Sequence, residues 1–200
     1  DDLNADSFSD ENAERFISET RFADMSATYV EFVRHLPAGG SILDAGSGSG
    51  RDSAWFKAHG FEVEAFDSSP AMVQATQSFA DIPARLLRFE DFQWEHSFDG
   101  IWACASLLHV PRSKFCAVID KLASALNHEG FIYCSFKHGT QERVSNGRYF
   151  NDMDERLLAE ALSHTQTYAT AMWRTNDVRP NRANEGWLNA LISKVQAPRS

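Results

Sequence analysis

Short apolar segments and longer amphipathic segments alternate along the first two thirds of the chain. The short segments have the length and apolar content of strands, and they span residues 41–46, 61–67, 84–90, 98–106 and 130–137. The longer segments carry apolar residues on one face and predict helices over residues 26–36, 51–60, 69–80 and 113–127. Ser69 is placed to cap the third of these helices, with Pro70 at its first position. The alternation indicates a mostly parallel sheet covered by helices.

The pattern changes after residue 137. Residues 138–152 are polar and contain glycine, which predicts a long loop. A helix is expected over residues 153–164, followed by two paired strands at residues 167–175 and 187–195. We find no internal repeat and no boundary between domains, so we expect a single domain over residues 1–200.

Composition narrows the classes of partner. The chain carries a formal net charge of −9, whereas proteins that bind nucleic acid usually present a basic face, so we expect no nucleic acid partner. No apolar run is long enough to cross a membrane, and we expect no membrane partner. The three cysteines form no C-x-x-C pair and the acidic start is unlike a signal peptide, which predicts reduced thiols in a cytoplasmic protein. The sequence contains no motif with metal-ligand spacing, so we predict no metal.

A glycine-rich stretch, ILDAGSGSGRDS at residues 42–53, joins the first predicted strand to the next helix. Such a turn places backbone N–H groups at a helix N-terminus, and glycine lets a ligand come close to the main chain. Asp67 ends the second predicted strand about twenty residues later, where an acidic residue accepts hydrogen bonds from ribose hydroxyls. A dinucleotide site reads G-x-G-x-x-G, but Arg51 stands at the position of the third glycine. The stretch therefore predicts a nucleoside-containing ligand, and the Arg51 position counts against a dinucleotide.

The segment ILDAGSGSG resembles the first motif of class I S-adenosylmethionine-dependent methyltransferases. The resemblance continues in order with Asp67, with RFEDF at 88–92, with SFDGIWACASLLHV at 97–110 and with LNHEGFIYCSFK at 126–137. Within that family, the short chain and the overall pattern look most like the small methyltransferases related to tellurite-resistance proteins. The resemblance implies a three-layer α/β sandwich with a Rossmann-like, mostly parallel seven-stranded sheet whose last strand is antiparallel. It also implies S-adenosylmethionine as cofactor and S-adenosylhomocysteine as product. The single domain would then comprise an N-terminal helical cap (1–38), a cofactor-binding core (39–137), and a lid loop, helix and closing strand pair (138–200).

Carried over by position, the resemblance implies a set of cofactor-binding residues. Asp44 would receive the cofactor's amino group, Asp67 would bind the ribose, and Met72 would offer an apolar face to the adenine. Tyr29, from the helix before the first strand, would close over the cofactor. The full set is Tyr29, Asp44, Ala45, Gly46, Ser47, Gly48, Asp67, Ser68, Met72, Asp91, Phe92, Ser106 and Leu107.

Two residues are candidates for the reacting end. His109 follows the fourth predicted strand, so we consider it as a base, as a substrate contact, or as a structural histidine that caps the turn. Arg148 ends the predicted loop after the fifth strand and is either a partner for an anionic substrate or a surface arginine. A base is needed only where the acceptor atom starts protonated, since positioning and desolvation serve an acceptor that is already anionic.

The sequence therefore predicts methyl transfer from S-adenosylmethionine to a small-molecule acceptor. Two alternatives stay open. The first is a non-catalytic protein that binds S-adenosylmethionine as a sensor or regulatory subunit, because fold and cofactor motifs do not establish an acceptor site. The second is a nicotinamide-dependent oxidoreductase, against which the Arg51 position counts.

Overall fold

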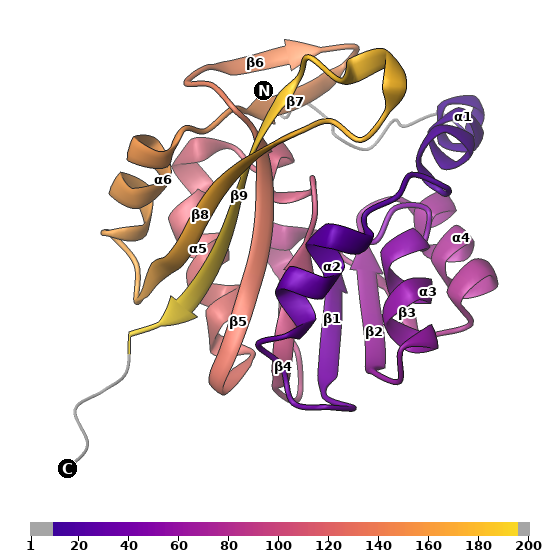
Figure 1. Ribbon diagram of the computed structural model, residues 1–200, viewed down its shortest axis with the longest axis horizontal. Coiled ribbons are helices and arrows are strands. Elements are labelled where there is room, and N and C mark those ends of the chain that lie inside the picture. The colour runs from indigo at the N-terminus through magenta and orange to yellow at the C-terminus, as the bar shows by residue number, and fades with distance from the viewer. Residues whose placement is uncertain (1–9, 196–200) are drawn as a thin grey trace.

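A computed structural model describes residues 10–195 and contains a seven-stranded sheet in the order β3-β2-β1-β4-β5-β9-β8 (Figure 1). The strands are β1 (Ser41–Ala45), β2 (Glu62–Asp67), β3 (Ala84–Leu86), β4 (Phe98–Ala103), β5 (Leu126–Lys137), β8 (Thr167–Asn176) and β9 (Gly186–Lys194). The first five run parallel, whereas β9 is antiparallel to both β5 and β8. The expected seven-stranded sheet with an antiparallel last strand is confirmed.

Helices cover both faces of the sheet and make the three layers (Figure 1). The helices are α1 (Asp10–Thr20), α2 (Ser26–Val33), α3 (Arg51–Ala58), α4 (Pro70–Ala80), α5 (Arg112–Ser124) and α6 (Glu155–Leu162). On one face, α2 and α3 bury Phe32 and Phe56 against Trp102 of β4. At the start of α4 the Ser69 hydroxyl accepts a hydrogen bond from the Met72 N–H, as its capping role predicts. Among the described residues, no helix combines the length and apolarity that a membrane crossing requires.

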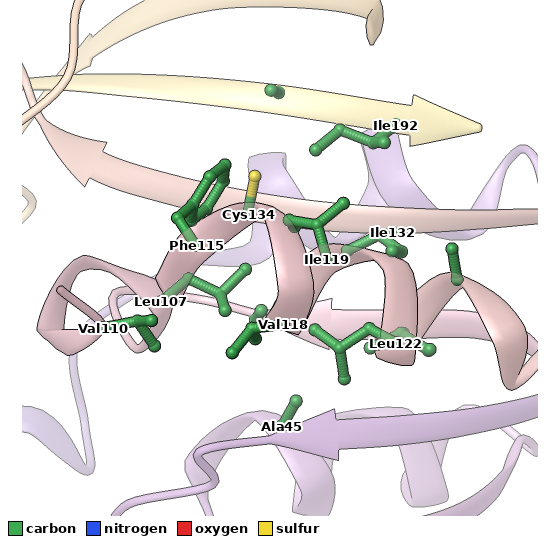
Figure 2. Close-up of a cluster of buried hydrophobic side chains, with 14 of the residues drawn as sticks. Ala45, Leu107, Val110, Phe115, Val118, Ile119, Leu122, Ile132, Cys134 and Ile192 are labelled. Atoms are coloured by element: carbon green, nitrogen blue, oxygen red, sulfur yellow. The ribbon is translucent and has the colours of Figure 1, made fainter. Parts of the chain in front are cut away.

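The larger core lies between α5 and the central strands. Figure 2 shows Phe115, Ile119 and Leu122 of α5 in one buried cluster with Ile132 and Cys134 of β5. Each of these side chains is fully buried. This packing sets the position of the loop that follows β4 and leads into α5, and that loop carries Ser106 and His109.

Two of the expected elements were wrong. Residues 138–152 contain a hairpin of β6 (Glu142–Ser145) and β7 (Arg148–Asn151) rather than an irregular loop. Its turn residues Asn146 and Gly147 both have positive φ, as a tight hairpin with an Asn-Gly turn requires. The strand expected over 84–90 ends at Leu86, and the chain then forms the 3₁₀ helix η1 (Phe89–Asp91). A second 3₁₀ helix, η2 (Leu107–His109), follows β4.

The hairpin is anchored to the start of α5. Arg112 donates from Nε to the Asn151 side-chain oxygen (2.9 Å) and from Nη2 to the Asp152 carbonyl (2.9 Å). Arg143 pairs with Asp152 at 2.7 Å. These contacts hold β6 and β7 beyond the carboxyl ends of β4 and β5, where Figure 1 shows them above the sheet.

Candidate functional site

The glycine-rich loop runs from Gly46 to Gly50, between the end of β1 and the start of α3. Gly46, Gly48 and Gly50 have φ of +81°, +55° and +77°, values that residues with a side chain rarely adopt. The backbone N–H groups of Gly46 and Ser47 donate to the Phe66 carbonyl of β2 at 2.9 and 3.1 Å. The loop is therefore tied to β2 as well as to its own strand.

At two of these glycines, other parts of the chain leave no room for a side chain. A Cβ on Gly46 would lie 2.4 Å from the Ser106 Cβ, and one on Gly50 would lie 2.8 Å from the Thr76 Cα. Ser106 is fixed there because its hydroxyl donates to the Ala45 carbonyl at 2.6 Å. Gly48 differs, since a Cβ there would meet only the Phe16 ring, at 3.3 Å. Gly48 is thus the glycine whose open side faces a side chain that can move away for a ligand.

Asp67 lies at the end of β2 beside this loop. One carboxylate oxygen accepts from the Gly48 N–H and the other from the Ser69 N–H, both at 2.9 Å. Burial raises the pKa of Asp67, and these two hydrogen bonds oppose that rise. An ionised carboxylate has about four lone-pair sites, so Asp67 retains acceptors for a ligand hydroxyl.

Asp44 and Asp52 form a buried acidic pair under the loop. Asp44 accepts from the Ser53 hydroxyl at 2.6 Å, and its pKa is raised by burial and by the charge of Asp52. Burial also opposes ionisation of Asp52, but Arg51 at 2.6 Å holds the pKa of that carboxyl below its ordinary value. A cation bound next to Asp44 would relieve this repulsion, which makes the site suited to a positively charged ligand.

Tyr29 does not lie over the loop. It is buried, its ring packs against Trp55 and Phe56, and its hydroxyl donates to Asp52 at 2.5 Å. The aromatic side chain beside the loop is instead Phe16 of α1. Arg21, just after α1, fixes this arrangement by donating to the Ser49 carbonyl at 3.2 Å. Sequence reasoning missed Phe16, although the amphipathic segment 10–20 carries it as an aromatic residue.

The residues expected near an adenine divide into exposed and buried ones. Ser68 and Asp91 are exposed, whereas Met72 and Phe92 are almost fully buried. Phe92 packs on Phe66 with ring centroids 5.5 Å apart. Phe89 of η1, which the sequence did not single out, lies 3.7 Å from where a Gly46 Cβ would be and packs edge-on against Phe66. Ala45, Ser47 and Leu107 complete the expected set and are buried around the loop and the start of η2.

His109 and Arg148 are brought together at the same edge of the sheet. Arg148 Nη2 donates to His109 Nε2 at 2.6 Å, and His109 Nδ1 lies 2.7 Å from the Tyr149 carbonyl oxygen. The Arg148 guanidinium carbon lies 5.9 Å from the centre of the Phe16 ring. Burial raises the pKa of Asp67, and the charge of Arg148 opposes part of that rise. The hairpin therefore places a cation at the mouth of the glycine loop.

The described residues bring most of the expected set to one place and leave part of it outside. The loop residues, Asp67, Ser106, His109 and Arg148 meet at the carboxyl edge of the sheet, whereas Tyr29 and Phe92 point into the core. Among residues 10–195, no group of three or more His, Cys, Asp or Glu side chains could hold a metal ion.

Comparisons with known proteins concern the family and the fold of the chain. A family model described as a methyltransferase domain matches residues 17–174. No curated protein sequence matches the chain. Among solved structures, 1,6-didemethyltoxoflavin-N1-methyltransferase of Burkholderia thailandensis, with bound 1,6-didemethyltoxoflavin and S-adenosylhomocysteine, gives a TM-score of 0.75 at 24% identity, over 92% of this chain and 83% of that one.

Two further structures resemble the chain over nearly their whole length. The N-methyltransferase NodS of Bradyrhizobium japonicum, in complex with S-adenosylhomocysteine, gives a TM-score of 0.70 at 13% identity, covering 93% of this chain and 98% of that one. A TehB-like S-adenosylmethionine-dependent methyltransferase of Corynebacterium glutamicum gives 0.69 at 20% identity, covering 92% and 98%. At these identities the likeness concerns the fold, which is the Rossmann-like fold of class I methyltransferases.

Proposed function

Because the chain belongs to the family of methyltransferase domains, we propose that it binds S-adenosylmethionine and transfers its methyl group to a small-molecule acceptor. One observation carries the proposal. Asp67 is held beside Gly48 by hydrogen bonds from the Gly48 and Ser69 N–H groups, at the point where β1 and β2 end next to each other. That arrangement suits a ligand whose ribose hydroxyls donate to Asp67 while the glycine loop supports the rest.

The chemistry of the donor set fits a cationic cofactor. Asp44 and Asp67 offer carboxyl oxygens beside the loop that a bound cation would keep ionised, and Phe16 and Phe89 offer aromatic surface. When bound, S-adenosylmethionine supplies a methyl group activated by a positively charged sulfur. The proposed contacts are Asp44 to the amino group, Asp67 to the ribose, and Ser68, Met72 and Asp91 around the adenine. Phe16 replaces Tyr29 as the proposed cover.

The reacting end is proposed to lie between Ser106, His109 and Arg148. Arg148 is half-buried near Phe16 of α1, and a partly desolvated guanidinium binds an anion more strongly than one in solution. We therefore propose that the acceptor is a small molecule with a negatively charged group, which Arg148 orients. The solved structure with bound 1,6-didemethyltoxoflavin supports a small-molecule acceptor in this fold.

The three segments predicted from the sequence are proposed to act on one site. The described part of segment 1–38 contributes Phe16, segment 39–137 contributes the glycine loop, Asp67 and His109, and segment 138–200 contributes Arg148. A location in the cytoplasm and the absence of nucleic acid and membrane partners remain predictions from composition.

The test is a turnover assay with purified protein and methyl-labelled S-adenosylmethionine. Small carboxylates, thiols and tellurite serve as acceptors, and mass spectrometry follows both the methylated product and S-adenosylhomocysteine. We expect product from at least one anionic acceptor with wild-type protein and none with Asp67→Ala. Tight cofactor binding without transfer to any acceptor would instead favour the non-catalytic alternative. Absence of binding to either adenosyl compound would overturn the proposal.

A further inference from the structure

The side chain of His109 joins two parts of the chain that meet above the sheet. It stands at the end of η2, after β4, and both of its ring nitrogens contact β7. Its ring also packs edge-on against Phe150 of β7, with centroids 4.9 Å apart. Because three contacts of one imidazole hold the hairpin, His109 fixes where β7 lies.

The identity of the two partners determines the protonation state of the ring. The Tyr149 carbonyl can only accept a hydrogen bond, so Nδ1 must carry the hydrogen. The Arg148 guanidinium can only donate, so Nε2 must offer its lone pair. Both conditions hold together only for the neutral ring with hydrogen on Nδ1, since an imidazolium would direct an N–H against the guanidinium.

The electrostatic surroundings of His109 also favour the neutral ring. Burial and then the charge of Arg148 lower the pKa of His109 to about 3. The charged groups that face this junction are Arg148 from β7 and, beyond it, Asp67 from β2, while Tyr149 directs its hydroxyl to Glu142 of β6. The ring is therefore neutral throughout the range in which an ordinary histidine titrates.

We propose that His109 is a positioning residue, which holds Arg148 at the mouth of the glycine loop through its Nε2 lone pair and does not take a proton from the acceptor. A general base needs a free lone pair within reach of the substrate proton, and the lone pair of His109 is already engaged by Arg148. The role of Arg148 toward the acceptor rests on the proposed function, whereas the state of the His109 ring does not.

The first experiment observes the ring directly, by ¹⁵N NMR of the full chain between pH 5 and 8. We expect the tautomer with hydrogen on Nδ1 and no titration of His109 in this range. In Arg148→Met the pKa of His109 should rise, because a neighbouring positive charge is gone. The matched control is Arg143→Met, which removes a hairpin arginine that contacts Asp152 and Phe150 but not His109. A His109 ring that titrates near its ordinary pKa in wild-type protein, or that carries hydrogen on Nε2, would overturn the proposal.

The second experiment separates positioning from proton transfer. His109→Gln places an oxygen near the Nε2 position, where it can accept from Arg148, whereas His109→Asn reaches only the Nδ1 position. We expect His109→Asn to raise the KM of an anionic acceptor by about tenfold or more with a much smaller effect on kcat, and His109→Gln to recover most of that loss. In an Arg148→Met background the two variants should be alike.

Loss of a general base has a different signature. It would lower kcat by about 10²–10⁴-fold in His109→Gln and His109→Asn alike, and that result would overturn the positioning role. Binding of S-adenosylhomocysteine by wild-type protein is measured in parallel. Absence of this binding would contradict the proposed function. The NMR experiment would still test the protonation state of the His109 ring independently.

Discussion

Replacement of Gly46 by alanine tests how tightly the glycine loop is packed against the chain that follows β4. The new methyl group would lie 2.4 Å from the Ser106 Cβ and 3.1 Å from its hydroxyl oxygen. Ser106 cannot turn aside freely, because its hydroxyl is bonded to the Ala45 carbonyl. The backbone of Gly46 also has φ of +81°, so alanine adds conformational strain to the collision.

The two effects have separate magnitudes. A left-handed backbone costs a residue with a Cβ about 1–2 kcal/mol, and overpacking a well-filled site costs about 1–3 kcal/mol. We therefore expect Gly46→Ala to lower the free energy of unfolding by about 2–5 kcal/mol. For a chain of this length that corresponds to a fall in Tm of roughly 4–20 °C. Cofactor affinity should fall as well, because the loop must shift away from Ser106.

Urea and thermal unfolding measure the change, and Gly60→Ala is the matched control. Gly60 has φ of +87°, but a Cβ there would meet nothing within 4 Å, so alanine brings the strain without the collision. Because Ser106→Gly also removes the hydrogen bond to the Ala45 carbonyl, the cost of Gly46→Ala is measured again in a Ser106→Gly background, where it should be smaller by the overpacking part. Equal destabilisation by Gly46→Ala and Gly60→Ala, or an unchanged cost of Gly46→Ala in the Ser106→Gly background, would refute the close contact between Gly46 and Ser106.

Three further predictions concern the acidic residues. Asp67→Asn leaves either the Gly48 or the Ser69 N–H without an acceptor, so affinity for S-adenosylhomocysteine should fall tenfold or more in calorimetry, and an unchanged affinity would count against Asp67 as the ribose ligand. The pKa of Asp44 is raised by burial and by Asp52, so the folded state holds this proton at a pH where the unfolded chain, with a pKa of about 3.9, has lost it. The contribution of Asp44 to stability should therefore fall as pH rises from about 4 to about 8, and over that range the slope of the urea midpoint against pH should be more positive in Asp44→Asn than in wild-type protein. Asp52→Leu removes the acceptor of Tyr29, Arg51 and Trp102 and should cost about 3–5 kcal/mol by urea unfolding, whereas a loss below 1 kcal/mol would mean that the buried network contributes little.

The sheet was predictable because its five parallel strands are short apolar runs, and an amphipathic helix follows β1, β2 and β4. That periodicity is local, and the glycine loop and Asp67 follow from it by their place at strand ends. The hairpin at 142–151 was also encoded locally, in the Asn146-Gly147 turn. The polar side chains around that turn concealed it, because β6 alternates exposed and half-buried residues and β7 is mostly half-buried, so neither strand has the fully buried apolar face that marks the central strands.

The contacts within the site depend on packing that no local pattern reports. Tyr29 and Phe16 both lie in helices before β1, and only the structure shows that Tyr29 faces Asp52 while Phe16 faces Gly48. From the sequence alone, the glycines were expected because a ligand must come close to the main chain there. The structure shows that Gly46 and Gly50 are required by Ser106 and Thr76, which come from segments far along the chain. Likewise, the pairing of His109 with Arg148 joins residues 39 apart and depends on the hairpin's position.

The central claim is that the glycine loop and Asp67 bind an adenosyl cofactor. Calorimetric titration of the purified chain with S-adenosylmethionine, S-adenosylhomocysteine and NAD tests it most directly. We predict binding of both adenosyl compounds at micromolar concentration and no binding of NAD. Binding of NAD, or no binding of either adenosyl compound by protein shown to be folded, would contradict the account.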